Sequence, residues 1–484
     1  MAEPRGWILP AFGIVAGVTA LRVLLLAFNR TDLFVDEAQY WFWGQELAFG
    51  YYSKPPLIAW VIRAATEIAG SDTPFWVRLP APLFHAATAM FLGAIAARIY
   101  GRAEAIAVAA AFVTLPMVAV GSLLISTDTI MFPFLALALL LYWRLVEEDA
   151  GTRSSALPLG AGIALGLAFL AKYAAVYYLG LTAVAAVIWP SVRPRPGDAA
   201  LILLAFGLTI APNVAWNVWN GFSTVTHTAD NIGWVREGAG LNFAGLAEFL
   251  GAQFAVFGPI LFGAFALLAV VRARGGARRV PAILLVLSLP IIGLVSAQAV
   301  LSKAYANWAA AAYLAGTLAV VPWLMRRPRW LAASYVVNGV ICLVLPVAAV
   351  FADRLRAGDD LLLKRYLGRA ELSDALFAVA RESGAAAIVS DDRDILADLF
   401  YTGRDAALPV FAWPEDGPPP HHYAQKHPYS GENAGPVLVA GLRDRALPCA
   451  GEARPLPAMT GGPGAYQRRT IQLFLVPPDC WKAD

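Results

Sequence analysis

The chain has 484 residues, of which 59% are hydrophobic and 15% are charged, and its mean hydropathy is +0.60. A soluble domain is typically about 45–50% apolar and about 25% charged, so this composition excludes a disordered chain and argues against a water-soluble globule. The net charge of +3 indicates no particular partner, and the three cysteines form no CxxC pair that would support a zinc or redox cluster. The chain is therefore predicted to be a polytopic membrane protein.

Apolar segments recur through the first 351 residues and approach the roughly 20 residues that cross a bilayer. In lipid, backbone polar groups are satisfied only in helices or closed barrels, and the alternating pattern of a barrel is absent from the sequence. We predict an all-helical membrane bundle of about eleven spans, with ends accurate to a few residues. The predicted spans are residues 7–28, 74–97, 103–121, 129–146, 156–171, 173–190, 199–217, 246–271, 280–297, 308–325 and 330–351.

Arginine is unevenly distributed over the loops between these spans. Every second loop carries arginine, and positive residues are enriched in cytoplasmic loops. These loops and the N-terminus are therefore predicted to be cytoplasmic, with the first span an uncleaved anchor and everything after residue 351 outside, as in a multi-pass protein of a bacterial inner membrane. The arginines concerned are Arg5, Arg98, Arg102, Arg144, Arg153, Arg193, Arg195, the cluster Arg272–Arg279, Arg326, Arg327 and Arg329.

The first outer loop, residues 29–73, is long and rich in aromatic residues. It contains the segment FVDEAQYWFW at 34–43 and the segment YYSKPPLIAW at 51–60. Trp and Tyr at this density are typical of a membrane interface, and two proline residues suit the start of a helix. The loop is predicted to form two interfacial helices, over 36–48 and 56–69.

From about residue 352 charged residues, proline and glycine become frequent. The pattern predicts helices at 373–383 and 394–401, a buried strand at 385–390 and a loop at 412–436. We divide the chain into a membrane domain, 1–351, and a small periplasmic α/β domain, 352–484. Cys449 and Cys480 are suited to a disulfide in the periplasm, and the sequence leaves their pairing open.

Acidic residues occur at two outward-facing positions in the predicted topology. Asp36 and Glu37 begin the first interfacial helix, and Asp128 stands where one span ends and the next begins. Ionisable groups near a membrane-embedded surface are costly and often functional. Because Asp is also a good helix N-cap, capping is the structural alternative for both Asp36 and Asp128.

Lysine is rare, and its placement is informative. Only Lys54, Lys172 and Lys303 precede residue 350, and each falls at an outward connection, where positive charge should be depleted. Snorkelling of the ammonium group to lipid headgroups is the structural alternative for any one of them.

These residue types together predict a particular chemistry. Carboxylates suit removal of a proton from a hydroxyl, ammonium groups suit an anionic phosphate, and aromatic and apolar surfaces suit a lipid tail. We therefore predict a site where a lipid-linked phosphate donor meets a hydroxyl acceptor. Candidates for contact with the substrates, some of which could equally cap helices, are Glu37, Tyr40, Tyr52, Tyr173, Asn217, Tyr305 and Asn307. No metal site is predicted, because His421, His422 and His427 lack ligand spacing.

Several of these segments resemble the GT-C glycosyltransferases. The two segments of the first outer loop are similar to the first loop of the aminoarabinose-transferase-like and protein-mannosyltransferase-like branch. Segments 127–129, 170–173 and 303–308 match the same pattern, in the same order, over about 300 residues.

The resemblance implies a polyprenyl-phosphate sugar donor, transfer at the periplasmic face and inversion at the anomeric carbon. By position, Asp36 matches the family's catalytic acidic residue and becomes the base for the acceptor hydroxyl. Asp128 matches the acidic residue of the second outer loop and is the second predicted catalytic residue, which orients the acceptor or stabilises positive charge developing on the sugar. Lys54 and Lys172 match basic positions associated with the donor phosphate, and Lys303 is a third candidate. No cofactor is implied, and a divalent metal stays open.

The sugar and the acceptor stay open as well. A lipopolysaccharide-type acceptor is the leading hypothesis, with core oligosaccharide, another envelope glycan and protein Ser/Thr as alternatives. Neither nucleic acid nor a nucleotide sugar is expected as a partner. The rival from another class is a flippase or transporter of lipid-linked sugars, which predicts charges near the bilayer midplane in broken helices.

Overall fold

The computed structural model describes residues 6–148, 154–232, 241–275, 279–432, 434–441, 447, 449, 451–462 and 464–481. The chain forms two units. The helical unit consists of Met1–Ala27, Ser53–Val61 and Arg78–Val347, and the mixed unit consists of Phe28–Tyr52, Ile62–Val77 and Ala348–Asp484. The predicted boundary at residue 351 stays a prediction, since these units are defined by contacts alone.

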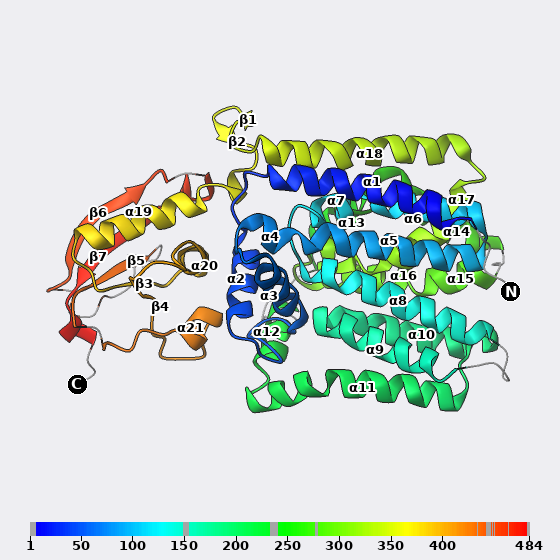
Figure 1. The fold of residues 1–484 in the computed structure, drawn as a ribbon, viewed down its shortest axis with the longest axis horizontal. Helices are drawn as coiled ribbons and strands as arrows, with labels where there is room; N and C mark the ends of the chain where they lie inside the picture. The colour runs from blue at the N-terminus through cyan, green and yellow to red at the C-terminus, as the bar shows by residue number, and fades with distance from the viewer. Residues whose placement is uncertain are drawn as a thin grey trace. The chain divides into compact units, whose positions relative to one another are not determined.

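The helical unit is built from apolar helices, most of which run along a common direction (Figure 1). Neighbouring helices pack through residues that are apolar on nearly all faces, as expected of a bundle in lipid. Its helices are α1 (Ile8–Ala27), α5 (Pro80–Ile99), α6 (Arg102–Val113), α7 (Pro116–Gly121), α8 (Thr127–Glu147), α9 (Ala156–Ala171), α10 (Val176–Ile188), α11 (Pro196–Trp219), α12 (Ser223–Ile232), α13 (Phe243–Phe257), α14 (Pro259–Gly275), α15 (Arg279–Val286), α16 (Leu289–Leu301), α17 (Ala312–Leu324) and most of α18 (Pro328–Val350).

Several of these helices are long enough to cross a membrane. Within the described residues, six apolar helical segments qualify by length and composition, or seven if one bent pair is a single span. Three shorter apolar helices, Ala156–Ala171, Tyr173–Ile188 and Ala312–Met325, also coincide with predicted spans. The prediction of a multi-pass helical membrane protein is confirmed, and the count of eleven spans stays a prediction.

Small residues allow α9 and α11 to approach closely. Gly162 and Gly166 are spaced as in a GxxxG motif, which brings membrane helices together. A Cβ added at Gly166 would lie 2.6 Å from the Cβ of Thr209, and one added at Gly162 would collide with the carbonyl oxygen of Ile202. This close contact fixes α11 beside α9.

The apolar stretch 246–271 is not the continuous helix that the sequence predicts. It forms α13 and α14, whose axes differ by 115°. Gly258, between them, has a φ of +90°, and a Cβ there would collide with the side-chain amide of Asn338. Pro259 has no N–H to continue the helix and disfavours helical geometry at the residue before it. The Gly-Pro pair therefore ends one helix and starts the next.

The mixed unit contains a five-stranded sheet in the order β4-β3-β5-β7-β6. β3 runs parallel to β4 and β5, and β7 runs antiparallel to β5 and β6. The predicted small α/β domain is confirmed. The helices predicted at 373–383 and 394–401 and the strand predicted at 385–390 are present with ends shifted by a few residues, whereas the predicted loop 412–436 contains a short helix, His422–Lys426. Its elements are β1 (Arg356–Ala357), β2 (Asp360–Leu361), α19 (Arg369–Glu382), β3 (Ala387–Ser390), α20 (Arg393–Thr402), β4 (Val410–Ala412), α21 (His422–Lys426), β5 (Val437–Gly441), β6 (Arg454–Thr460) and β7 (Thr470–Val476).

The two central strands are fully buried. Every residue of β3 and β5 is buried, and apart from Ser390 these strands carry no polar side chain, rather than alternating apolar and polar residues. Val389, Val439 and Val476 pack into one cluster beneath them. Cys449 and Cys480, 31 residues apart, form a disulfide at the edge of this cluster, which answers the question that the sequence left open.

The first outer loop contributes the helices that were predicted there, α2 (Val35–Gln45) and α3 (Leu57–Ala69), followed by α4 (Pro74–Arg78). In the mixed unit, α2 packs against α20. The ring of Phe42 lies 4.6 Å from that of Phe400, and the ring of Trp41 lies 5.0 Å from that of Tyr401. A helix near the N-terminus is thus joined to the C-terminal sheet domain by a shared aromatic core.

Candidate active site

Asp128 lies in the first turn of α8. Ser126 is the N-cap of this helix, because its Oγ accepts the backbone N–H of Thr129 at 3.3 Å. The capping alternative for Asp128 is therefore wrong. Its carboxylate remains at the positive end of the helix dipole, where a negative charge is stabilised, and it is available for other contacts.

Asp128 joins two other predicted site residues. The Nζ of Lys172 lies 2.8 Å from each carboxylate oxygen, and the Nδ2 of Asn307 donates to Oδ2 at 3.0 Å. The side chains of Asp128 and Lys172 are only 10% and 18% exposed. We call these three residues the Asp128 cluster. Residues 44 and 179 positions apart in sequence meet here, and Lys172 forms an ion pair rather than reaching into the headgroups.

A neutral polar network begins at the next residue, Tyr173. Its hydroxyl donates to Oδ1 of Asn213 at 3.0 Å and accepts from Nδ2 of Asn217 at 3.2 Å. Asn213 and Asn217 are one turn apart on α11 and are almost fully buried. Within the described chain, Oδ1 of Asn217 has no hydrogen-bond partner. The network holds Tyr173 against α11 and fixes the turn that carries Lys172.

The segment 303–308 presents an exposed cation and aromatic rings. The Nζ of Lys303 lies 4.6 Å from the centre of the Tyr305 ring, which is 52% exposed, and the rings of Tyr305 and Trp308 are 5.6 Å apart. Asn307, in the same segment, reaches Asp128. The segment therefore connects an accessible cation–aromatic surface to the Asp128 cluster.

Asp36 lies in the mixed unit, at the second residue of α2. Its Oδ1 accepts from Nη2 of Arg393 at 2.5 Å, and Nε of the same arginine donates to Oε1 of Gln39 at 2.8 Å. Arg393 is not among the residues predicted from the sequence. Nothing in the sequence marks it, since an arginine at the start of an amphipathic helix resembles ordinary surface charge and its partner lies 357 residues away.

The other candidates of the first loop have partners within the protein. Glu37 is 1% exposed and accepts the N–H of Phe34 at 2.9 Å, which is the arrangement of a helix-capping glutamate. Tyr40 is 6% exposed, with its ring 5.3 Å from that of Trp43. The hydroxyl of Tyr52 donates to the carbonyl oxygen of Pro419 at 2.9 Å. The substrate contacts expected of these residues stay predictions.

Lys54 lies in the helical unit, in the segment Ser53–Val61, and is half-buried. Its role at the donor phosphate stays a prediction, as do those of Asp36, Asp128, Lys172 and Lys303.

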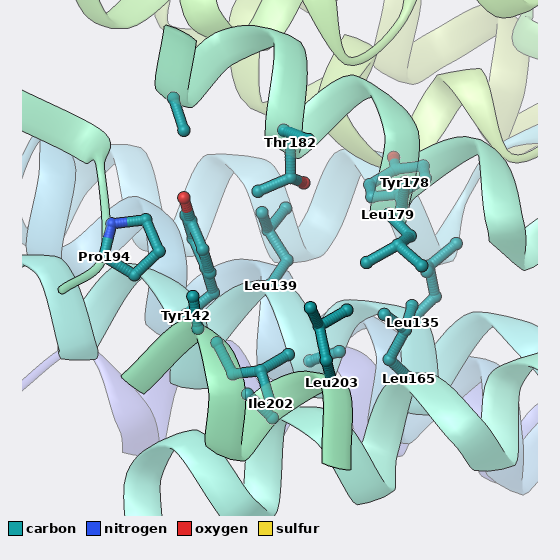
Figure 2. A pocket seen from close by; sticks show the side chains of 15 residues that line it. Leu135, Leu139, Tyr142, Leu165, Tyr178, Leu179, Thr182, Pro194, Ile202 and Leu203 are labelled. Carbon is teal, nitrogen blue, oxygen red and sulfur yellow. The ribbon is translucent and has the colours of Figure 1, made fainter. Parts of the chain in front are cut away.

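The helical unit also contains an apolar cavity of about 170 Å³ between α8, α9, α10 and α11 (Figure 2). Leu139, Leu165 and Leu203 point into it. The hydroxyl groups of two tyrosines at its wall are already bonded to backbone carbonyls, those of Val192 and Ala311. A cavity without free polar groups at these positions is suited to hydrocarbon rather than to a sugar.

Comparison of the sequence with known proteins identifies the family of this chain. Residues 53–216 match the family model described as dolichyl-phosphate-mannose-protein mannosyltransferase. The chain is 41% identical over 484 residues to the lipid A galacturonosyltransferase RgtD of Rhizobium johnstonii, covering 99% of each chain.

Solved structures share the fold. The crystal structure of ArnT from Cupriavidus metallidurans in the apo state has a TM-score of 0.66 at 15% identity, covering 95% of this chain and 97% of ArnT. The structure of the same protein bound to undecaprenyl phosphate has a TM-score of 0.65, at the same identity and coverage. At this level of identity the likeness concerns the fold.

A polytopic helical bundle with a small sheet domain and an ArnT-like fold defines a class of membrane-embedded proteins. The full-length match then identifies the chain: it belongs to the GT-C glycosyltransferases, in the ArnT-like branch. The resemblance drawn from the sequence is confirmed.

Proposed function

We propose that this chain transfers galacturonic acid from a polyprenyl-phosphate donor to a hydroxyl group of lipid A, at the periplasmic face of the inner membrane. The main support for this proposal is the 41% identity to a lipid A galacturonosyltransferase over 99% of both chains. The match covers the bundle and the sheet domain alike, which supports the same activity for the whole chain.

A polyprenyl-phosphate donor is supported by the chemistry of the helical unit. ArnT, which shares the fold, has been crystallised with undecaprenyl phosphate. In this chain Lys172 and Lys303 supply ammonium groups suited to a phosphate, and the apolar cavity is suited to part of an isoprenoid chain. Lys54 is the third proposed cation.

In the proposed reaction Asp36 is the general base. Arg393 holds Oδ1, whereas Oδ2 has no hydrogen-bond partner among the described residues, and the side chain is 48% exposed. Oδ2 accepts the proton of the lipid A hydroxyl as its oxygen attacks the anomeric carbon from the face opposite the leaving group. The bond from that carbon to the phosphate oxygen breaks, and polyprenyl phosphate leaves with the negative charge, stabilised by the lysines. Asp128 orients Lys172. The configuration at the anomeric carbon is inverted.

The reaction is a substitution that moves no electrons to or from a carrier, so the proposal includes no cofactor. A divalent metal that assisted the leaving phosphate would make transfer sensitive to chelation, which a titration with EDTA measures. The flippase hypothesis requires movement of the lipid without bond breaking, so a vesicle assay that separates flipping from sugar transfer tests it.

The function is tested by mass spectrometry of lipid A from a strain that lacks the gene. We expect the loss of one hexuronosyl residue, restored by the wild-type chain and not by Asp36→Asn. A lost hexose or pentose would assign a different sugar, an unchanged lipid A with an altered envelope protein would favour the protein O-mannosyltransferase alternative, and an unchanged envelope would refute the proposal.

A further inference from the structure

Arg393, the first residue of α20, directs its guanidinium toward α2 within the mixed unit. Its Nη2 and Nε are engaged by Asp36 and Gln39. Burial would lower the pKa of the guanidinium, but the neighbouring Asp36 carboxylate outweighs burial and raises that pKa. The group is therefore a fixed positive charge beside the proposed base.

One side of the Arg393 guanidinium, formed by Nη1 and Nη2, can bind a further group. An arginine has five N–H donors in a planar fork, and the two contacts to α2 use only the side of the fork that includes Nε. Among the residues that the structure describes, Nη1 has no hydrogen-bond partner, and 37% of the side chain is exposed. The edge formed by Nη1 and Nη2 has the geometry that binds a carboxylate through two parallel hydrogen bonds.

The two acidic neighbours of Arg393 in the chain are engaged elsewhere. Asp394, the next residue of α20, forms an ion pair with Arg469 at 3.5 Å. Asp392 accepts the N–H groups of Asp394 and Ile395 as the N-cap of α20. The carboxylate of Asp394 is therefore paired with another arginine, and that of Asp392 caps the helix.

The position of Arg393 matches the chemistry of a uronic acid. In galacturonic acid the carboxylate is attached to C5, and only the ring oxygen separates C5 from the anomeric carbon. A cation that binds this carboxylate must therefore stand close to the base that acts at the anomeric centre, as Arg393 stands beside Asp36.

We infer that Arg393 binds the C6 carboxylate of the donor sugar and selects an acidic sugar over a neutral one. The inference rests on the proposed function, because it takes Asp36 as the base and a uronosyl group as the sugar. It assigns the sugar-selecting contact to the sheet domain rather than to the helical bundle.

The test uses the full-length purified chain and two probes, short water-soluble prenyl-phosphate esters of galacturonic acid and of galactose, whose dissociation constants are measured by calorimetry. The probes share the phosphate and differ only in the carboxylate. The wild-type chain should bind the galacturonosyl probe about 10- to 100-fold more tightly, the effect of a charged hydrogen-bonded pair. Arg393→Gln should abolish this preference and leave the galactosyl probe unaffected, and Arg393→Lys should retain part of it.

Arg404→Gln is the matched control, since Arg404 lies just beyond the C-terminal end of the same helix and pairs with Asp405. It should keep the full preference, and unchanged melting midpoints confirm that the variants are folded. Equal weakening of both probes by Arg393→Gln would mean that Arg393 binds phosphate and would overturn the inference. So would a wild-type chain without preference, or a preference that survives the substitution. Failure of the proposed function is a separate result: no galacturonosyl transfer to lipid A by the wild-type chain.

Discussion

The ion pair between Asp128 and Lys172 offers a test in which structural and functional roles separate. The ammonium and carboxylate atoms are 2.8 Å apart, and both side chains are largely buried. At an effective dielectric constant of about 20, the attraction at this distance is about 6 kcal/mol, most of it offset by desolvation of the two charges. Removing one partner leaves an unpaired buried charge and should cost about 3–5 kcal/mol of folding stability.

A double-mutant cycle measures these terms. Asp128→Leu and Lys172→Met should each destabilise the chain, and the double variant should recover most of the loss, because no buried charge remains unpaired. Sugar transfer should behave differently: if Lys172 binds the donor phosphate, transfer falls about 10- to 100-fold in every variant that lacks it. The readouts are unfolding of the purified chain in detergent and initial rates in vesicles.

The exposed pair Lys364 and Asp360 provides the control, since its side chains are 35% and 30% exposed. Its coupling should stay below about 1 kcal/mol, and its variants should transfer sugar normally. Additive destabilisation by the two buried substitutions would refute the ion pair. Recovery of transfer in the double variant would refute a role at the donor phosphate and leave the cluster with a purely structural one.

Three further predictions concern the fold. Gly258→Ala should lower the melting midpoint, because the φ of +90° at Gly258 and the adjacent Asn338 side chain exclude a Cβ. Gly251→Ala is the control and should leave the midpoint unchanged, because a Cβ at Gly251 meets nothing within 4 Å. Equal midpoints for the two variants would contradict the explanation given for the α13–α14 break. Burial lowers the pKa of His422 to about 3, so its contribution to stability is complete above the unfolded pKa of about 6.5 and is lost as the pH falls. The free energy of unfolding should drop by about 2 kcal/mol between pH 7.5 and pH 5, and His422→Phe should remove this pH dependence. A drop that persists in the variant would mean that another titrating group causes it. Cys449→Ser opens a loop of 31 residues and should cost about 3–4 kcal/mol in the mixed unit, measured as a lower melting midpoint that reductant no longer changes; a midpoint equal to that of the oxidised wild type would refute the disulfide's contribution.

Much of the architecture could be predicted because it depends on local pattern. Long apolar segments predicted membrane helices, and the change in composition after residue 351 predicted a separate α/β region. Asp128 was singled out because a charge next to an apolar span is costly, and Lys172 because it is a rare lysine at an outward connection; the structure brings them into contact. The break at Gly258 and Pro259 had a usable signal, a Gly-Pro pair in the middle of a span, that hydropathy alone does not register.

The remainder depends on contacts between distant parts of the chain. The pairing of Asp36 with Arg393, and of α2 with α20, follows from how the mixed unit folds and has no local signature. Ser126 rather than Asp128 caps α8, because both residue types are good caps and only backbone geometry decides between neighbours.

The most direct test of the central claim is transfer by the purified chain in vesicles that contain only lipid A and a polyprenyl-phosphate galacturonic acid, with the product identified by mass spectrometry. We expect lipid A that gains one hexuronosyl residue, and loss of this product in Asp36→Asn. Absence of the product with the wild-type chain, or its formation from a nucleotide sugar instead, would contradict the account.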